Sequence, residues 1–155
     1  MDSPAKYIDH TLLKADATNL EIAALCEEAV EYGFASVCVP PVFVAQASRI
    51  LYGSEVAVCT VVGFPLGSQT TEVKVFETHQ AIASGADEID MVIHLGAARV
   101  SDYASVGDEI SQVIAASDHG LVKVIIECCL FDPSVKAKLV EVVVASGADY
   151  VKTST

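Results

Sequence analysis

The sequence ASGADEID at residues 83–90 returns almost unchanged as ASGADYVK at residues 145–152, and a looser copy, YGFASVC, spans residues 32–38. Each copy contains a glycine that follows an amphipathic run and precedes an apolar run. Glycine is typical of the position just past a helix end, because it adopts a left-handed conformation without steric cost. The repeat therefore predicts, three times in one chain, a helix that ends and a buried strand that begins.

The repeat also predicts which side chains lie at the same height on their strands. When the copies are aligned on their glycines, Cys38, Asp90 and Lys152 each lie five residues further on. These residues fall on the second, fourth and sixth expected strands. In a closed barrel, alternate strands contribute side chains to one interior layer. We therefore expect a thiol, a carboxylate and an amine to share a layer.

Short runs rich in β-branched residues alternate with longer amphipathic runs along the whole chain, an order typical of parallel βαβ units. The expected strands are Tyr7–His10, Ser36–Val39, Val56–Val62, Glu88–Ile93, Val122–Glu127 and Tyr150–Thr153. The expected helices are Asn19–Tyr32, Pro41–Leu51, Thr71–Ser84, Tyr103–Ala116 and Pro133–Ser146.

This pattern predicts an α/β fold of the TIM (β/α)8 barrel family, as a single α/β domain over residues 1–155. Such a barrel needs about eight strands and about 250 residues, whereas six strands are expected here. The residues leave three alternatives open: a fragment that lacks strands seven and eight, an open sheet, or closure by partner chains.

Composition excludes several classes of protein. Of 155 residues, 52% are hydrophobic and 19% are charged, which excludes intrinsic disorder. The net charge of −12 has the wrong sign for nucleic acid or anionic lipid, and no apolar run is long enough to span a bilayer, so we expect a cytoplasmic protein with neither partner. The five cysteines form no C-x-x-C pair, and no histidine stands at metal-ligand spacing, so neither a disulfide framework nor a metal site is expected.

Lys152 and Asp90 are the strongest candidates for chemistry, because charged side chains inside apolar strands need a partner or a function. Burial and a neighbouring cation both favour the neutral amine that attacks a carbonyl to form a Schiff base. Lys123 is a candidate for that cation. It shares one face of its strand with Ile125 and Glu127, but alternation does not say whether that face is interior.

Simpler readings compete with these assignments. Lys152 could be a solvated residue near the end of the chain, Asp90 a structural ion-pair partner, and Cys38 a packing residue. Asp9 and His10 could cap the turn after the first strand instead of contacting a substrate.

The sequence GFPLG at residues 63–67 follows the third expected strand, where the loops of a barrel site emerge. Its glycines indicate a tight turn with close backbone approach. It matches neither the P-loop motif nor the dinucleotide-binding motif, so nucleotide binding is not supported.

Taken together, these motifs resemble those of the deoxyribose-phosphate aldolase family, in order and along the whole chain. The resemblance rests on YIDHTLLK (7–14), SVCV (36–39), VVGFPLG (61–67), EIDMVI (88–93), VKVIIE (122–127) and VKTST (151–155). It implies a class I aldolase that reversibly cleaves 2-deoxy-D-ribose 5-phosphate to D-glyceraldehyde 3-phosphate and acetaldehyde, with no metal or cofactor.

The resemblance also implies roles for individual residues. The Schiff-base lysine falls on Lys152 and the proton-relaying aspartate on Asp90. Asp9, Cys38 and Lys123 correspond to residues that line the family's active site. Three positions depart from the family pattern: Pro40 and His94 each stand where asparagine is common, and Cys128 where threonine is common.

In the family, a seventh strand carries a second lysine and an eighth strand helps to bind the substrate phosphate. We therefore expect residues 1–155 alone to be nearly inactive, and their open strand edges to favour homo-oligomers. The alternatives are a catalytically weak or inactive barrel segment that serves as a scaffold or interaction module, and a doubly wound domain that binds a small phosphorylated ligand.

Overall fold

The structure is a computed structural model that describes residues 3–155. These residues form two compact units. The first comprises the chain up to Val61 together with Ala81–Glu88, and the second comprises Val62–Gln80 together with Ile89–Thr155. The expectation of a single domain over residues 1–155 remains a prediction.

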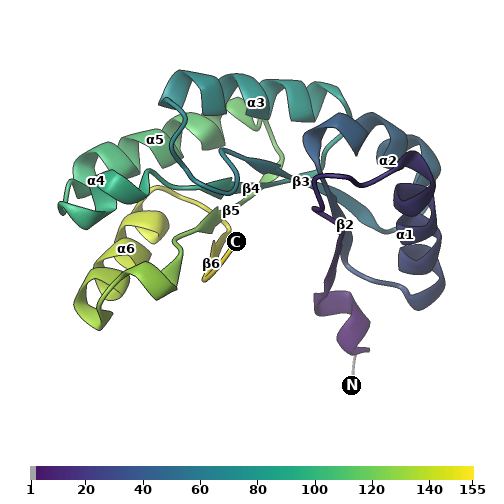
Figure 1. The fold of residues 1–155 in the computed structure, drawn as a ribbon, viewed down its shortest axis with the longest axis horizontal. Helices are drawn as coiled ribbons and strands as arrows, with labels where there is room; N and C mark the ends of the chain where they lie inside the picture. Colours follow the sequence, from purple (N-terminus) through teal and green to yellow (C-terminus); the bar gives the residue numbers. More distant parts are fainter. Residues whose placement is uncertain (1–2) are drawn as a thin grey trace. The chain divides into compact units, whose positions relative to one another are not determined.

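The first unit contains neighbouring parallel strands with helices packed against them. Its strands are β1 (Asp9–Thr11), β2 (Ser36–Val39) and most of β3 (Ala57–Val62), in that order. Its helices are α1 (Asn19–Tyr32) and α2 (Val44–Ile50), with short 3-10 turns η1 (Pro4–Tyr7) and η2 (Pro41–Phe43). The two helices contact each other and β2, and Figure 1 shows them side by side. In the register of the strands, Cys38 lies opposite Thr11 on one side and Cys59 on the other.

Helix α1 begins and ends where its sequence specifies. The Thr18 hydroxyl accepts a hydrogen bond from Glu21 N, and the Glu21 carboxylate accepts one from Thr18 N, which together form a capping box. The hydrogen bonds that the Thr18 hydroxyl and Thr18 N donate to the Glu21 carboxylate lower the pKa of Glu21. The helix ends at Gly33, which has a φ of 65° in the left-handed region. Its buried residues, Ile22, Leu25, Cys26 and Ala29, follow the spacing of one helical face.

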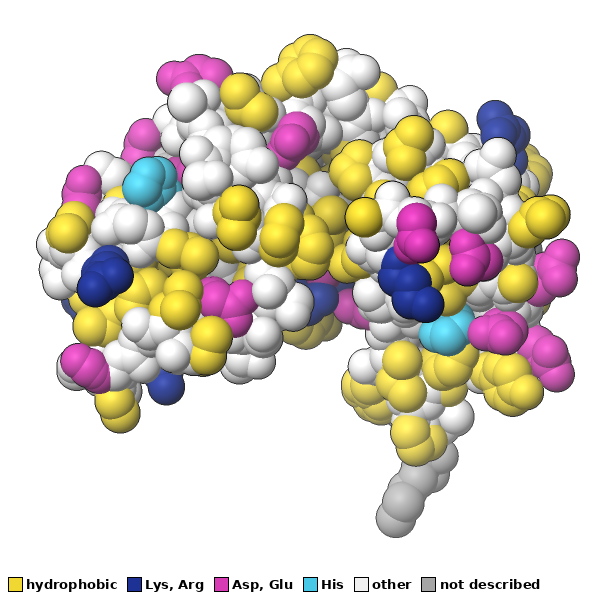
Figure 2. All heavy atoms as spheres, in the orientation of Figure 1, with side chains coloured by type: hydrophobic (Ala, Val, Ile, Leu, Met, Phe, Trp, Pro, Cys, Tyr) yellow, Lys and Arg dark blue, Asp and Glu magenta, His cyan; other side chains and the backbone are white. Residues whose placement is uncertain are grey.

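The second unit contains the remaining strands and helices. Its strands are β4 (Glu88–Val92, whose first residue belongs to the first unit), β5 (Leu121–Ile125) and β6 (Tyr150–Lys152), in that order. Its helices are α4 (Leu95–Arg99), α5 (Tyr103–Ala116), α6 (Pro133–Ala145) and most of α3 (Thr71–Ala83), with a 3-10 turn η3 (Cys128–Leu130). Helix α5 contacts both α4 and α6. Figure 2 shows hydrophobic side chains over α6, where Val140 and Val144 are exposed.

The aspartates of the internal repeat fix the strands that follow them. Asp87 Oδ2 accepts a hydrogen bond from Val58 N at 2.8 Å, and Asp87 N donates to Val58 O. In the second copy, Asp149 Oδ2 accepts from Val122 N at 2.9 Å, and Asp149 N donates to Val122 O. Each aspartate thus pins its strand to the start of the preceding one. Asp90 and Lys152 each lie three residues after such an aspartate. The same pair of hydrogen bonds therefore sets which face of its strand each of these two residues occupies.

Most predicted elements are confirmed. The first strand covers Asp9–Thr11 and not Tyr7–His10, because the 3-10 turn η1, which begins with a proline after Ser3, occupies the preceding residues. The fifth strand ends at Ile125 and not at Glu127, and the helix predicted over Pro41–Leu51 is the turn η2 followed by α2. The short α4 and η3 were not predicted, since they are too brief to show a periodicity. Among the described residues, no helix has the length and apolar character needed to cross a membrane.

Candidate active site

Three of the predicted site residues meet in the second unit. Lys152 Nζ donates a hydrogen bond to Asp90 Oδ2, and Lys123 Nζ lies 3.3 Å from Asp90 Oδ1. Asp90 is 1% exposed, whereas the Lys152 side chain retains 32% exposure. The buried carboxylate therefore holds two ammonium groups from β5 and β6, and one of these groups remains accessible to a small molecule.

The cluster answers two questions that the sequence left open. The face of β5 that carries Lys123 is the one that faces Asp90, and Lys123 itself is buried. Lys152 is paired with a buried carboxylate and is not a solvated tail. Two ammonium groups at one carboxylate repel each other, so loss of the Lys152 proton removes that repulsion. A neutral amine beside a carboxylate can attack a carbonyl group and exchange protons with its neighbour.

Asp9 and Cys38 belong to the first unit. Asp9 Oδ1 accepts a hydrogen bond from Ser36 Oγ at 2.8 Å, which links β1 to the start of β2. His10 Nε2 lies 2.8 Å from Glu28 Oε2 of α1. Cys38 is 2% exposed in the middle of β2. The site roles assigned to Asp9 and Cys38 remain predictions.

The segment that follows Lys152 is bound by Glu127. The Glu127 carboxylate accepts hydrogen bonds from the hydroxyls of Ser154 and Thr155, from Thr155 N and from the Cys129 thiol. The Thr155 side-chain hydrogen bond is the main cause that lowers the pKa of Glu127. The hydrogen bond from the Cys129 thiol to Glu127 is the main cause that raises the pKa of Cys129.

A second buried charge pair supports the loop after β3 and the end of β4. Lys74 Nζ donates to Glu109 Oε1 at 2.6 Å, to Gly67 O at 3.0 Å and to Val92 O at 2.8 Å. Glu109 Oε2 in turn accepts a hydrogen bond from His94 N at 2.8 Å. Burial lowers the pKa of the Lys74 ammonium, and the hydrogen bond to Glu109 opposes that shift. This pair ties α3, the loop and α5 to the strand that carries Asp90.

The GFPLG loop forms the tight turn that its glycines predict. Gly67 N donates to Gly63 O at 2.7 Å, and both glycines have a φ of 63°. A Cβ on Gly67 would lie 2.0 Å from Ile93 O, so only glycine allows the backbones to approach this closely. Gly63 N donates to Glu77 Oε2 at 2.8 Å. The loop is thus fastened to α3 and to the end of β4.

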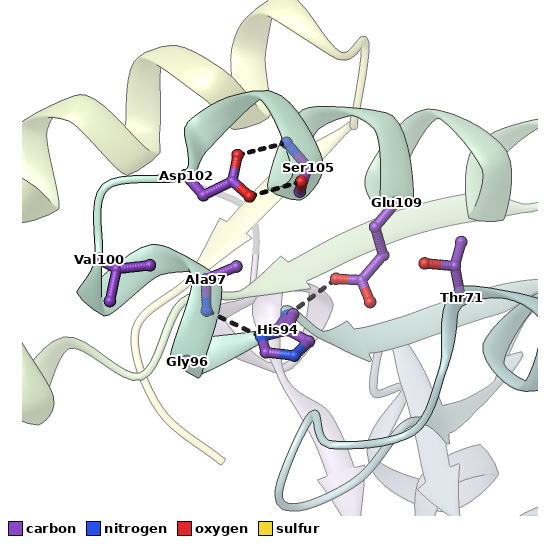
Figure 3. Close-up of a pocket in the computed structure, with 8 residues that line it drawn as sticks. All are labelled: Thr71, His94, Gly96, Ala97, Val100, Asp102, Ser105 and Glu109. Atoms are coloured by element: carbon purple, nitrogen blue, oxygen red, sulfur yellow. Dashed lines mark hydrogen bonds between the residues drawn. The ribbon is translucent and has the colours of Figure 1, made fainter.

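A pocket of about 430 Å³ lies beside the amino end of α5, and Figure 3 shows its lining. It is lined by Thr71, His94, Gly96, Ala97, Val100, Asp102, Ser105 and Glu109. His94 Nδ1 accepts from Ala97 N, and the Asp102 carboxylate accepts from Ser105 N, so both side chains cap helices. Its lining includes none of the residues of the Asp90 cluster. We therefore place the candidate chemistry at that cluster.

Sequence reasoning missed Lys74 and Glu109 and did not recognise the role of Glu127. A signal for two of them was present. Glu109 lies three residues after Val106 and four before Val113, so it falls on the apolar face of α5. Lys74 falls on one face of α3 with the buried Thr78 and Ala81.

A parallel βα fold with a lysine–carboxylate cluster is the architecture of a barrel-type aldolase. A family model described as DeoC/LacD family aldolase matches residues 4–155, and the chain belongs to this family of aldolases, which are lyases. The deoxyribose-phosphate aldolase of Syntrophotalea carbinolica (strain DSM 2380 / NBRC 103641 / GraBd1) is 57% identical over 155 residues, which are 100% of this chain and 70% of that protein. The deoxyribose-phosphate aldolase of Streptococcus equi subsp. zooepidemicus (strain MGCS10565) is 55% identical over 150 residues, or 97% of this chain and 68% of that protein.

Solved structures agree with the family assignment. A structure described as QR15, an aldolase, matches with a TM-score of 0.95 at 37% identity, over 100% of this chain and 69% of that one. A structure described as a unique tetrameric deoxyribose phosphate aldolase from Aeropyrum pernix matches with a TM-score of 0.90 at 36% identity, over 97% of this chain and 63% of that one. The predicted family and the α/β barrel-type fold class are confirmed. The chain spans 63% of the Aeropyrum chain, less than two thirds of it.

Proposed function

We propose that Lys152 is the Schiff-base nucleophile of a deoxyribose-phosphate aldolase site, with Asp90 as its proton relay and Lys123 as the neighbouring cation. The observation that carries this proposal is the hydrogen bond from Lys152 Nζ to the buried Asp90 carboxylate, with Lys123 Nζ 3.3 Å from the other oxygen. The aldolases of Syntrophotalea and Streptococcus, which match nearly all of this chain, support the choice of a phosphorylated deoxy sugar and its aldehyde products as substrates.

The first step is attack of the neutral Lys152 amine on the substrate carbonyl carbon. Asp90 Oδ2 is positioned to receive a proton from the Lys152 nitrogen, since the two atoms already share a hydrogen bond. The addition gives a carbinolamine, and proton donation to its hydroxyl group releases water and forms the iminium ion. The β-hydroxyl group of the bound sugar then gives its proton to the Asp90 carboxylate and becomes the carbonyl group of the departing aldehyde. The carbon–carbon bond breaks, and its electron pair moves toward the positive nitrogen, which leaves an enamine. Protonation of the enamine and hydrolysis of the resulting iminium ion regenerate Lys152.

Lys123 holds this carboxylate in place through the cycle. Its ammonium group balances Asp90 while Lys152 passes between its neutral and iminium forms. Like-charge repulsion from Lys123 also favours the neutral form of Lys152, which is the form that reacts.

Borohydride reduction tests the proposal. The chain is incubated with acetaldehyde and borohydride, and peptide mass spectrometry locates any N-ethyl lysine. We expect the adduct on Lys152, and we expect Lys152→Met to abolish it. Lys138→Met is the matched control, because Lys138 lies on the exposed face of α6, where it pairs with Glu141. A folded wild-type chain that forms no adduct on Lys152, or equal labelling of Lys138, would refute the proposal.

We further propose that the chain self-associates and acts in the cytoplasm as one domain. The tetrameric Aeropyrum pernix relative supports self-association, as does the exposure of Val140 and Val144 on α6. Sedimentation at micromolar concentration tests this, and a single monomeric species would contradict it. The low activity expected of residues 1–155 alone remains a prediction, which a comparison of kcat with that of a full-length relative would check.

A further inference from the structure

Glu127 combines a strained backbone with a buried carboxylate, immediately after the strand that carries Lys123. Its φ of 46° and ψ of 66° lie in the left-handed region, which a residue with a side chain rarely adopts. Its side chain is nearly buried. Strain of this kind persists only where surrounding contacts hold it, and it concentrates at functional sites.

The contacts that hold Glu127 come from the residues just after Lys152. Glu127 Oε2 accepts from Thr155 N at 3.1 Å and from Thr155 Oγ1 at 2.8 Å. Glu127 Oε1 accepts from Ser154 Oγ at 3.0 Å and from Cys129 Sγ at 3.4 Å. Both oxygens are thus directed at one short segment, and the carboxylate acts as a clasp on residues 153–155.

The backbone on either side of Glu127 completes the clasp. Ile126 N donates to Lys152 O at 3.0 Å, and Cys128 N donates to Thr153 O at 2.7 Å. In a regular parallel ladder, donors two residues apart pair with carbonyls two residues apart. Here the two carbonyls are consecutive, so the Glu127 side carries one extra residue, as in a β-bulge. Bulges near functional sites change the direction of a neighbouring side chain.

We propose that Glu127 is a positioning residue for Lys152: its clasp on residues 153–155, with the bulge at its own backbone, fixes the direction in which Lys152 leaves β6 toward Asp90. The role rests on the function proposed above, in which Lys152 is the nucleophile. The left-handed backbone places Ile126 N and Cys128 N on consecutive carbonyls, and the carboxylate prevents the segment from swinging away. The Lys152 carbonyl is itself one of the two backbone acceptors, and the bonds to the carboxylate begin two residues after it.

Two substitutions separate the clasp from the backbone strain. Glu127→Gln removes the charge and half of the acceptor capacity but keeps the side-chain size. Glu127→Gly adopts the left-handed conformation without strain but has no side chain. Glu141→Gln, on the exposed face of α6, is the matched control. Circular dichroism of each variant confirms that it is folded.

The first readout is independent of aldolase chemistry. Acetic anhydride acylates Lys152 and the exposed Lys14 in the same sample, and the ratio of their rates reports how far the Lys152 amine is held at Asp90. We expect both Glu127 variants to raise this ratio about ten-fold, and the Thr155 amide to exchange its hydrogen about ten-fold faster, while Glu141→Gln changes neither. Unchanged ratios in both Glu127 variants would overturn the proposal.

The second readout is the rate of borohydride trapping with acetaldehyde. A displaced amine should react about ten-fold or more slowly in both Glu127 variants, because small errors in position are costly to the rate. If Glu127→Gly trapped acetaldehyde at the wild-type rate while Glu127→Gln did not, only the backbone conformation would position Lys152. That result would overturn the role of the carboxylate clasp. If the wild-type chain traps no aldehyde, the aldolase proposal fails, whereas the acylation ratio still decides the positioning by Glu127.

Discussion

Lys152 donates a hydrogen bond to Asp90, although the two residues lie on β6 and β4 with β5 between them. Lys123, on that intervening strand, approaches the same carboxylate from its other oxygen. The cluster therefore draws one residue from each of three neighbouring strands. Asp90 is buried, whereas the Lys152 side chain is partly exposed. The Lys152 amine therefore has both a proton acceptor and access to a substrate.

Replacement of Lys123 should shift the pH at which Lys152 reacts. In Lys123→Met, no ammonium group repels the Lys152 ammonium, so its protonated form becomes more stable. We expect the pH of half-maximal borohydride trapping to rise in this variant. The measurement is the trapping rate between pH 6 and 10, with Lys138→Met as the control. A midpoint that stays constant or falls would show that Lys123 does not favour the neutral amine.

Replacement of Lys74 should destabilise the fold more than loss of a surface lysine. Lys74→Met leaves the Glu109 carboxylate buried without its cation, which costs about 3–5 kcal/mol of the free energy of unfolding. Lys74→Met combined with Glu109→Gln should recover part of the loss, because the neutral amide can still accept from His94 N. Urea denaturation measures these differences, and Lys138→Met should cause no measurable change. Equal stability of Lys74→Met and the wild type would refute this account.

Two glycines with nearly the same φ should differ in their tolerance of alanine. Gly33 has a φ of 65° with nothing within 4 Å of an added Cβ, so Gly33→Ala should cost only conformational strain, about 1–2 kcal/mol. Gly67 has a φ of 63°, and its Cβ would meet Ile93 O at 2.0 Å, so Gly67→Ala should add about 1–3 kcal/mol for overpacking. The comparison uses the free energy of unfolding. Similar losses in the two variants would show that the loop after β3 can move away from β4.

The buried thiol of Cys26 should make stability fall in alkaline solution. Burial raises the pKa of Cys26 from 9.0 to about 11. The folded state therefore retains a proton that the unfolded state releases, so its stabilising effect is complete below about pH 9 and is lost as the pH rises toward about 11. We expect the free energy of unfolding to fall less steeply over this window in Cys26→Ala than in the wild type. A Cys26→Ala slope that matches the wild type would contradict the prediction.

Much of the candidate site could be predicted because its residues lie in repeated local patterns. The alignment of the two ASGAD copies puts Asp90 and Lys152 at one position after their glycines, and the structure joins these two side chains. Lys123 was also a candidate, but the alternation of side chains along its strand did not show which way its face points. The extent of the first strand was wrong, since the competing 3-10 turn depends on a capping bond from Ser3.

The sequence by itself determined the order of strands and helices and the helix ends at glycines. These features depend on residues a few positions apart, whose spacing sets which side is buried. Only the tertiary structure decided that Lys74 pairs with Glu109 and that Glu127 binds the segment after Lys152. Such contacts join residues far apart in the chain, and their geometry depends on how the helices and strands pack, which no local periodicity contains.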